Sequence, residues 1–230
     1  MTTRRHTSAL VALAAGLLLG ACSSGSGDEG LAPAEVLAQA KQTLDETSGV
    51  HVVLATEKLP AGISGIVSAD GIGIHPPAFE GDLKIATSGI TGDAEVVAVD
   101  DVVYAKLPFT TEFARVDPAE YGAPDPADLM APDGGLSSLL TAVESPEEGD
   151  PVRDGEAVLT EYSGTVPGDV VAAIIPSASA DSEFDATFTI TDDNVLNQAE
   201  ITGSFYPDTG DVTYTIDFDQ YDTAREISAP

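Results

Sequence analysis

The sequence lacks tryptophan and contains one cysteine, Cys22, among its 230 residues. A single thiol excludes a disulfide within the chain, so packing alone must stabilise the fold. Basic residues are also scarce, because nine Lys and Arg stand against 39 Asp and Glu, for a net charge of −30 at pH 7. A surface this negative repels phosphate backbones, which excludes nucleic acid as a partner. The acid excess favours solubility and salt tolerance outside the cell over calcium storage.

Residue types that carry catalysis are few as well. Beyond the amino-terminal segment the only histidines are His51 and His75, and the chain has no Gly-x-Ser-x-Gly elbow, phosphate loop or paired metal-ligand histidines. The acidic turns 192–194 and 208–211 do not match the EF-hand pattern. Carboxylates are so abundant that some pair will have glycosidase separation by chance, so a hydrolase stays a remote alternative. We therefore predict a protein that is not an enzyme and has no metal ligands or cofactor.

The longest apolar run, residues 9–19, is too short to span a bilayer, which needs about 20 apolar residues. Arg4 and Arg5 precede the run and small residues follow it, which is the pattern of a secretory signal. The Leu-Gly-Ala-Cys sequence that ends at Cys22 resembles the lipobox of bacterial lipoproteins. That resemblance implies that Cys22 is lipidated and becomes the mature amino terminus. The alternative is an ordinary secreted protein with a free thiol.

The chain is predicted to have three parts. Residues 1–21 are the lipoprotein signal peptide, residues 22–32 a lipidated tether rich in Ser and Gly, and residues 33–230 a single domain. A hydrophobic content of 43%, with 22 Gly and 15 Pro, is typical of a turn-rich globular chain. The mature protein is expected at the extracytoplasmic face of the cell membrane, held there by its lipid anchor.

The spacing of apolar residues predicts the secondary structure. Helical spacing predicts helices over 33–47, 136–143 and 170–175. Alternation predicts strands over 50–57, 81–87, 95–99, 102–106, 157–165, 186–190, 199–205 and 212–218. Segments 117–135 and 147–155, rich in Pro, Gly and acids, are predicted to be connections, the first with one helical turn near 127–130.

The stretch 63–74 is unusual because its Ile and Val residues alternate with Gly, Ser and Ala. Glycines within strands often mark bends or places where another molecule approaches the backbone. A twisted edge hairpin explains the same pattern equally well.

The last three predicted strands each have one polar and one apolar face, as in antiparallel sheets with one solvated side. Helices are the only available cover for the apolar face, so we predict an α+β fold with a curved antiparallel sheet and helices on its concave side. Apolar pockets between such layers are common ligand sites. A filled core produces the same pattern, and on the pattern alone it is the favoured interpretation.

Five segments of the chain resemble a known family in order and spacing. They are 77–85, 103–107, 117–121, 125–127 and 135–140. Together with the lipobox and the tether, they are similar to the actinobacterial LppX/LprA/LprF/LprG lipoproteins over nearly the whole mature chain. The resemblance implies a strongly curved antiparallel half-barrel, with helices covering its concave face and an apolar cavity for acyl chains between the layers.

The resemblance also implies a function, which is binding and carriage of di- or triacylated lipids or glycolipids in the cell envelope, without catalysis and as a monomer. Some family members work with a major-facilitator exporter, so such an exporter is a candidate partner. An envelope scaffold lipoprotein with a filled core is the alternative. The residues expected to line the cavity are Leu54, Ile63, Ile66, Ile72, Ile74, Leu83, Ile85, Val97, Val99, Tyr104, Leu136, Leu139, Leu140, Val143, Val170 and Ile174.

Overall fold

A computed structural model describes residues 30–87, 89–121 and 123–230. The predicted signal peptide and Cys22 lie outside the described residues. Residues 31–230 form one compact unit.

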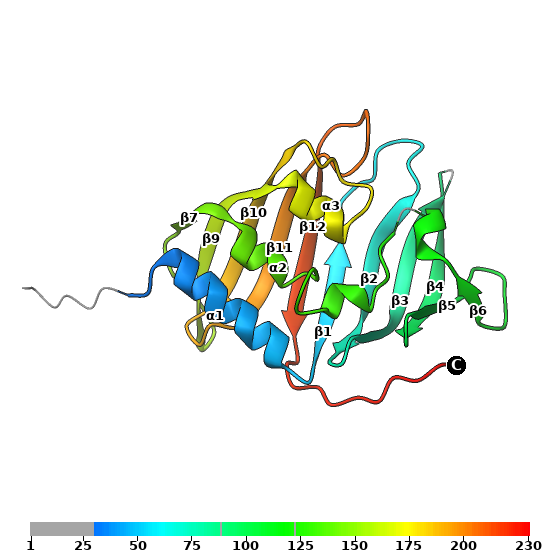
Figure 1. Cartoon of the computed structure of the whole chain (residues 1–230), viewed down its shortest axis with the longest axis horizontal. Helices are drawn as coiled ribbons and strands as arrows, with labels where there is room; N and C mark the ends of the chain where they lie inside the picture. Colours follow the sequence, from blue (N-terminus) through cyan, green and yellow to red (C-terminus); the bar gives the residue numbers. More distant parts are fainter. Residues whose placement is uncertain (1–29, 88, 122) are drawn as a thin grey trace, which may run out of the picture. The chain divides into compact units, whose positions relative to one another are not determined.

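Twelve strands of this unit form one open antiparallel sheet in the order β6-β5-β4-β3-β2-β1-β12-β11-β10-β9-β7, with β8 paired to β9 (Figure 1). The amino-terminal strands are β1 (Gly49–Ala55), β2 (Gly65–Ile74), β3 (Ala78–Thr87), β4 (Ile90–Val99), β5 (Val102–Lys106) and β6 (Ala114–Val116). The carboxy-terminal strands are β7 (Glu144–Glu148), β8 (Val152–Asp154), β9 (Ala157–Pro167), β10 (Glu183–Thr191), β11 (Leu196–Gly203) and β12 (Val212–Asp219). β1 pairs with β2 on one side and with β12 on the other. The β1–β12 pair therefore joins the two groups of strands into one sheet.

Helices cover one face of the sheet, as predicted. They are α1 (Pro33–Glu46), α2 (Ser138–Ala142), α3 (Gly168–Ile174) and the 3-10 turns η1 (Pro118–Tyr121) and η2 (Asp128–Met130). In Figure 1, α1, α2 and α3 lie over the carboxy-terminal strands, whereas the segment with η1 and η2 crosses toward β2–β6. The predicted α+β half-barrel with helices on its concave face is confirmed.

The helix α1 forms where its sequence predicts one. Pro33 suits the first helical position, and the Glu35 carboxylate accepts a hydrogen bond from the Ala32 N–H at 3.1 Å. Its apolar stripe, which contains Leu37 and Leu44, is buried in the main hydrophobic core. That burial, rather than helix propensity, supplies most of the stability of such a short helix.

The main core fills the space between the helices and the carboxy-terminal strands. Phe205 packs edge to face on Phe184 and on Tyr214, with ring centroids 4.9 and 5.0 Å apart. Phe184, Phe188 and Phe205 are almost completely buried. Aromatic side chains of this size dominate the energetics of a core, so this half of the sheet is the better packed one.

Some predicted boundaries are wrong. Segment 147–155 contains part of β7 and all of β8, because edge strands pair through their backbones and can leave every side chain in solvent, so no alternation marks them. The short edge strand β6 was also missed, because only Val116 of its three residues is partly buried, which is too little for alternation to mark it. The helix predicted over 136–143 is only Ser138–Ala142, since Val143 is already extended. β11 ends at Gly203, and Phe205 turns into the core.

The stretch 63–74 forms an interior strand, so the twisted edge hairpin considered for it is wrong. β2 lies between β1 and β3. Its glycines mark close approaches by other parts of this chain, because a Cβ at Gly71 would lie 2.5 Å from Cζ of Phe79 and one at Gly73 would lie 2.4 Å from Sδ of Met130. Gly71 requires glycine because the Glu80 carbonyl oxygen would also lie 2.6 Å from such a Cβ, whereas at Gly73 only the flexible Met130 side chain would have to move.

Candidate functional site

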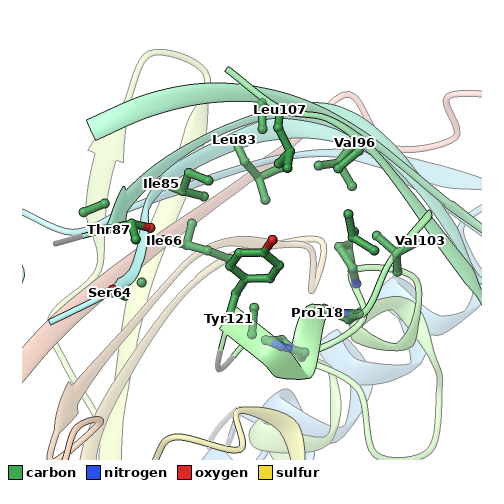
Figure 2. A pocket seen from close by; sticks show the side chains of 18 residues that line it. Ser64, Ile66, Leu83, Ile85, Thr87, Val96, Val103, Leu107, Pro118 and Tyr121 are labelled. Carbon is green, nitrogen blue, oxygen red and sulfur yellow. The ribbon is translucent and has the colours of Figure 1, made fainter. Parts of the chain in front are cut away.

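The first chamber of an apolar cavity lies under the concave face of the amino-terminal strands. Figure 2 shows these strands arching over it, with Pro118 and Tyr121 of η1 on the opposite side. Its lining residues are Ser64, Gly65, Ile66, Leu83, Ile85, Ala86, Thr87, Ala94, Val96, Val103, Ala105, Leu107, Val116, Pro118, Tyr121, Ala123, Pro124 and Pro126. Small side chains such as Ala94 and Ala105 leave this space unfilled.

A second chamber lies beside the first, where α2 and α3 come near the middle of the sheet. Its lining residues are Leu54, Gly65, Ile66, Tyr121, Ala123, Pro124, Leu129, Leu136, Leu139, Val171, Ile174, Ile175, Ser177, Ile201, Phe205, Tyr206, Tyr214 and Ile216. Ile66 and Tyr121 line both chambers, so the two spaces adjoin along these side chains. Figure 2 shows the Tyr121 ring pointing from η1 into the space beneath the strands.

Each chamber is small. The space that the centre of a water molecule can reach is about 80 Å³ in each, which is below the range of about 300–1,000 Å³ for pockets that enclose a drug-sized ligand. The accessible space is therefore narrow, and it suits a segment of a thin, flexible apolar chain better than a whole globular ligand.

The lining offers little chemistry for catalysis. Neither set of lining residues contains Asp, Glu, His, Lys, Arg or Cys. Within the described ranges, no group of three or more His, Cys, Asp or Glu could hold a metal ion. In the same part of the chain, none of the helices has the length and apolar character that crossing a membrane requires.

Two tyrosines form the main polar feature of the second chamber. The hydroxyls of Tyr206 and Tyr214 are hydrogen bonded at 2.7 Å, and the Tyr214 hydroxyl donates to the Ile66 carbonyl at 3.1 Å. Burial, and then the bond with Tyr206, raise the pKa of Tyr214 above its ordinary value, so its hydroxyl stays neutral. The pair satisfies its own hydrogen bonds and leaves the rest of the wall apolar.

The structure brings some of the predicted residues together. Ile66, Leu83 and Ile85 line the first chamber. The second chamber is lined by the predicted residues Leu54, Ile66, Leu136, Leu139 and Ile174.

Other predicted residues face the opposite side of the sheet, so their assignment to the cavity wall is corrected. Val97 forms a small cluster with Ala78 and Ile227 of the carboxy-terminal segment, and Ile74, Val99 and Tyr104 pack against this cluster. Ile72 pairs with His51 and Glu80, whose polar side chains also occupy this outer face. A bulge between Ile66 and Ser68 reverses the alternation of β2, which sends Ile72 and Ile74 away from the side that Ile66 faces.

The remaining predicted residues lie in or against the main core and do not line either chamber. Leu140 is completely buried in that core, and Ile63, Val143 and Val170 pack against its margin.

Sequence reasoning missed several residues of the site. Val96, Val103 and Ala105 could have been found by strand pairing, because Ala94 pairs with Leu83 and the alternate positions of β4 and β5 must then share its face. Tyr121 and Pro124 belong to an irregular segment without periodicity. No sequence signal separates them from an ordinary surface loop.

Residues 32–228 match the family model described as LppX_LprAFG lipoprotein. The lipoarabinomannan carrier protein LprG of Mycobacterium tuberculosis is 30% identical over 214 residues, which cover 87% of this chain and 88% of that protein. The crystal structure of LprF from Mycobacterium bovis has a TM-score of 0.69 at 18% identity and covers 86% of this chain and 96% of that one. The crystal structure of LppX from M. tuberculosis has a TM-score of 0.61 at 20% identity, with coverages of 85% and 97%. At these identities the two structures bear on the fold alone, and that fold agrees with the sheet and helices described above.

Proposed function

This chain belongs to the LppX/LprAFG lipoprotein family, and we propose that it carries acylated lipids or glycolipids in the cell envelope, with the acyl chains held in the two chambers. The observation that carries the proposal is the narrow space itself, whose wall is apolar and contains no Asp, Glu, His, Lys, Arg or Cys. An ordinary filled core would leave no such space. Carriage requires no catalytic residue, so we propose a carrier that is not an enzyme.

Burial of acyl chains supplies enough free energy for binding. Each buried methylene contributes about 0.8 kcal/mol. About a dozen of them outweigh one or two polar contacts of about 1 kcal/mol each. The number and length of the acyl chains should therefore determine selectivity, and the headgroup should matter less.

The two chambers favour a cargo with more than one chain. Ile66 and Tyr121 stand between them, so we propose that different chains of one di- or triacylated lipid occupy different chambers. The name of the relative LprG, a lipoarabinomannan carrier protein, supports an acylated glycolipid as the class of cargo. The bonded pair of Tyr206 and Tyr214 provides polar groups in the second chamber for an ester or sugar oxygen to meet.

The remaining parts of the proposal concern the anchor and the partners. We propose that residues 1–21 are a signal peptide, that Cys22 carries the lipid anchor, and that residues 22–32 tether a single domain, 33–230, to the outer face of the cell membrane. The protein is proposed to act as a monomer and to exchange cargo with a major-facilitator exporter. Family membership supports a lipoprotein anchored in the envelope.

Native mass spectrometry of residues 31–230, purified from a lipid-rich host, tests the carrier function. This part of the chain forms one compact unit with its own hydrophobic core, so it can be studied without its anchor. We expect mass additions that match diacyl or triacyl lipids and that disappear after extraction with organic solvent. Repeated spectra without any ligand would instead favour the envelope scaffold with a filled core.

A further inference from the structure

Large apolar side chains are exposed at few places in the described part of the chain, and most of those places adjoin one chamber. The exposed residues are Leu31, Ile90, Phe109, Tyr121 and Val152. Of these, Tyr121 lines the first chamber, and Ile90 and Phe109 lie next to residues that do. Scattered single apolar residues are normal on a surface, but a group around one opening calls for an explanation. We call Ile90, Phe109 and Tyr121 the rim.

Ile90 lies just beyond the end of the chamber wall. It pairs with Thr87, an exposed residue that lines the chamber. Ile90 also lies an even number of residues from Ala94 and Val96 in β4, so it is on the same face of the strand as these lining residues. Along β3, Leu83 is buried, Ile85 is half-buried and Thr87 is exposed, so the chamber reaches the surface at this end. Ile90, which is 75% exposed, therefore continues the apolar wall into solvent.

Phe109 lies beside the same opening. It follows the lining residue Leu107, and Pro108 contacts the backbone of β4, since a Cβ at Gly92 would lie 2.5 Å from its Cγ. The Phe109 side chain is completely exposed, and its φ of 71° is in a region that bulky side chains rarely adopt. Because the Phe109 side chain is not buried, no core packing offsets the free-energy cost of its exposure and of its backbone conformation. Contact of this side chain with another molecule would offset that cost.

The segments nearest the opening carry little charge. Although 21% of all residues are charged, the stretches 59–69, 87–92 and 107–111 contain no Asp, Glu, Lys or Arg. The connections β1–β2, β3–β4 and β5–β6 lie at the same end of the strands, because the strands are antiparallel. Charged residues of these connections flank the uncharged stretches, with Glu57 and Lys58 before residue 59 and Glu112 after residue 111. The β3–β4 turn beside Ile90 is therefore uncharged, and so is the part of the β5–β6 connection that contains Phe109.

We propose that the rim and the uncharged stretches beside it dock onto the surface of a lipid bilayer, with Phe109 and Ile90 entering the acyl region and the first chamber opening toward the lipid. This inference rests on the proposed carrier function and adds the surface through which cargo enters. The uncharged stretches 87–92 and 107–111 suit a bilayer because they add nothing to the negative charge by which the rest of this acidic chain repels anionic headgroups. Just below the rim, Asp93 pairs with Lys84 and Glu95 pairs with Lys106. Apolar tips that enter the headgroup boundary are a common means of peripheral membrane binding.

The absence of tryptophan from this chain gives a direct test. Phe109→Trp in residues 31–230 introduces a single tryptophan at the rim. As a control, Val152→Trp introduces one at an exposed position of β8, which pairs with β9 at the opposite end of the strand order. With vesicles of phosphatidylcholine, or of equimolar phosphatidylcholine and phosphatidylglycerol, we expect Trp emission from the Phe109→Trp variant to shift to the blue. Brominated phosphatidylcholine should quench it. Emission from the Val152→Trp variant should not change.

A second measurement keeps the test independent of the fluorophore. The double change Ile90→Ser and Phe109→Ser should lower the fraction of protein that floats with vesicles on the order of tenfold, while Val152→Ser leaves it unchanged. The double variant should still contain lipid by native mass spectrometry, because neither residue lines a chamber. Unshifted, unquenched emission from the Phe109→Trp variant would overturn bilayer docking and indicate that the rim faces a protein. Absence of lipid from the parent protein would overturn the carrier function instead.

Discussion

The two halves of the sheet share one backbone architecture but differ in what fills their concave faces. Over β9–β12 the inward positions carry large side chains such as Phe184, Phe188 and Ile190, and three helices close over them. Over β2–β5 the inward positions include Ala94, Ala98 and Gly81, and only irregular turns lie opposite. The first half is mostly packed core, with the second chamber at its margin near the middle of the sheet, and the second half encloses the first chamber.

The difference shows how a curved sheet acquires a cavity without any special backbone. Each half offers the same curved face, and the volume of its inward side chains decides whether the space beneath is filled. A protein interior is normally packed almost to crystal density. Ala and Gly at inward positions, opposite a segment that has only short 3-10 turns, leave space that a ligand can occupy. The two halves can therefore be compared with the same substitution, using Leu83 for the open half and Leu196 for the filled half.

Truncation of these leucines should give the largest difference in stability. Leu196 is 2% exposed in the main core, so Leu196→Ala should lower the free energy of unfolding by about 3–5 kcal/mol. Leu83 is 8% exposed and already borders empty space, so Leu83→Ala should cost only about 2 kcal/mol. Urea denaturation of both variants measures the difference. Equal losses would mean that the open half is packed as tightly as the other.

Enlargement of the same leucines should give opposite results. Leu196→Trp overpacks a filled core and should cost about 3 kcal/mol. Leu83→Trp places its ring in the first chamber, so stability should change by less than about 1 kcal/mol while bound lipid is lost. Melting temperature and native mass spectrometry on each variant give both readouts. A large loss of stability in Leu83→Trp, with no lipid on the parent protein, would show that a core has been mistaken for a cavity.

The smallest effect is expected at the seam between the halves, where β1 lies. On the outer face His51 contacts Asp70 of β2 at 2.9 Å and Asp219 of β12 at 2.6 Å. The hydrogen bond with Asp70, and then that with Asp219, raise the pKa of His51 although partial burial opposes them. The protonated form therefore stabilises the fold below the unfolded pKa of about 6.5. This stabilisation is lost as the pH rises through the raised folded pKa.

Replacement of this histidine should remove that pH dependence. His51→Gln should flatten the change in unfolding free energy between about pH 5 and 8, by at most about 1 kcal/mol, because both carboxylates are exposed and screened. Urea denaturation across this range measures it, with His75→Gln as the matched control. The same slope in wild type and in His51→Gln would show that the bridge does not couple the halves.

Much of the fold followed from sequence patterns. The helix at Pro33 and the three alternating strands near the carboxy terminus lie close to where periodicity predicts them, because each has one buried and one solvated face. The edge strand β8 could not be predicted, since its side chains are all exposed and only backbone pairing defines it.

The candidate site was less predictable, and two local features explain why. The run from Val96 to Val99 is apolar at every position, so alternation cannot tell which residues face the cavity; Val96 does, whereas Val97 and Val99 face Ile227. The bulge after Ile66 leaves no recognisable mark in the sequence, yet it reverses the face of every later residue in β2. Leu83 was assigned to the wall through the family resemblance, and the structure places it there.

The sequence by itself determined the elements, the acidic surface and the resemblance to a lipoprotein family, because these depend on local periodicity, composition and motif order. Tertiary structure decided whether the interior is filled, since volume depends on which side chains from distant strands meet. It brought Tyr121 of an irregular segment opposite Leu83, and it placed Ile66 and Tyr121 in the walls of both chambers. These juxtapositions join residues that are far apart in the chain, so no local pattern could encode them.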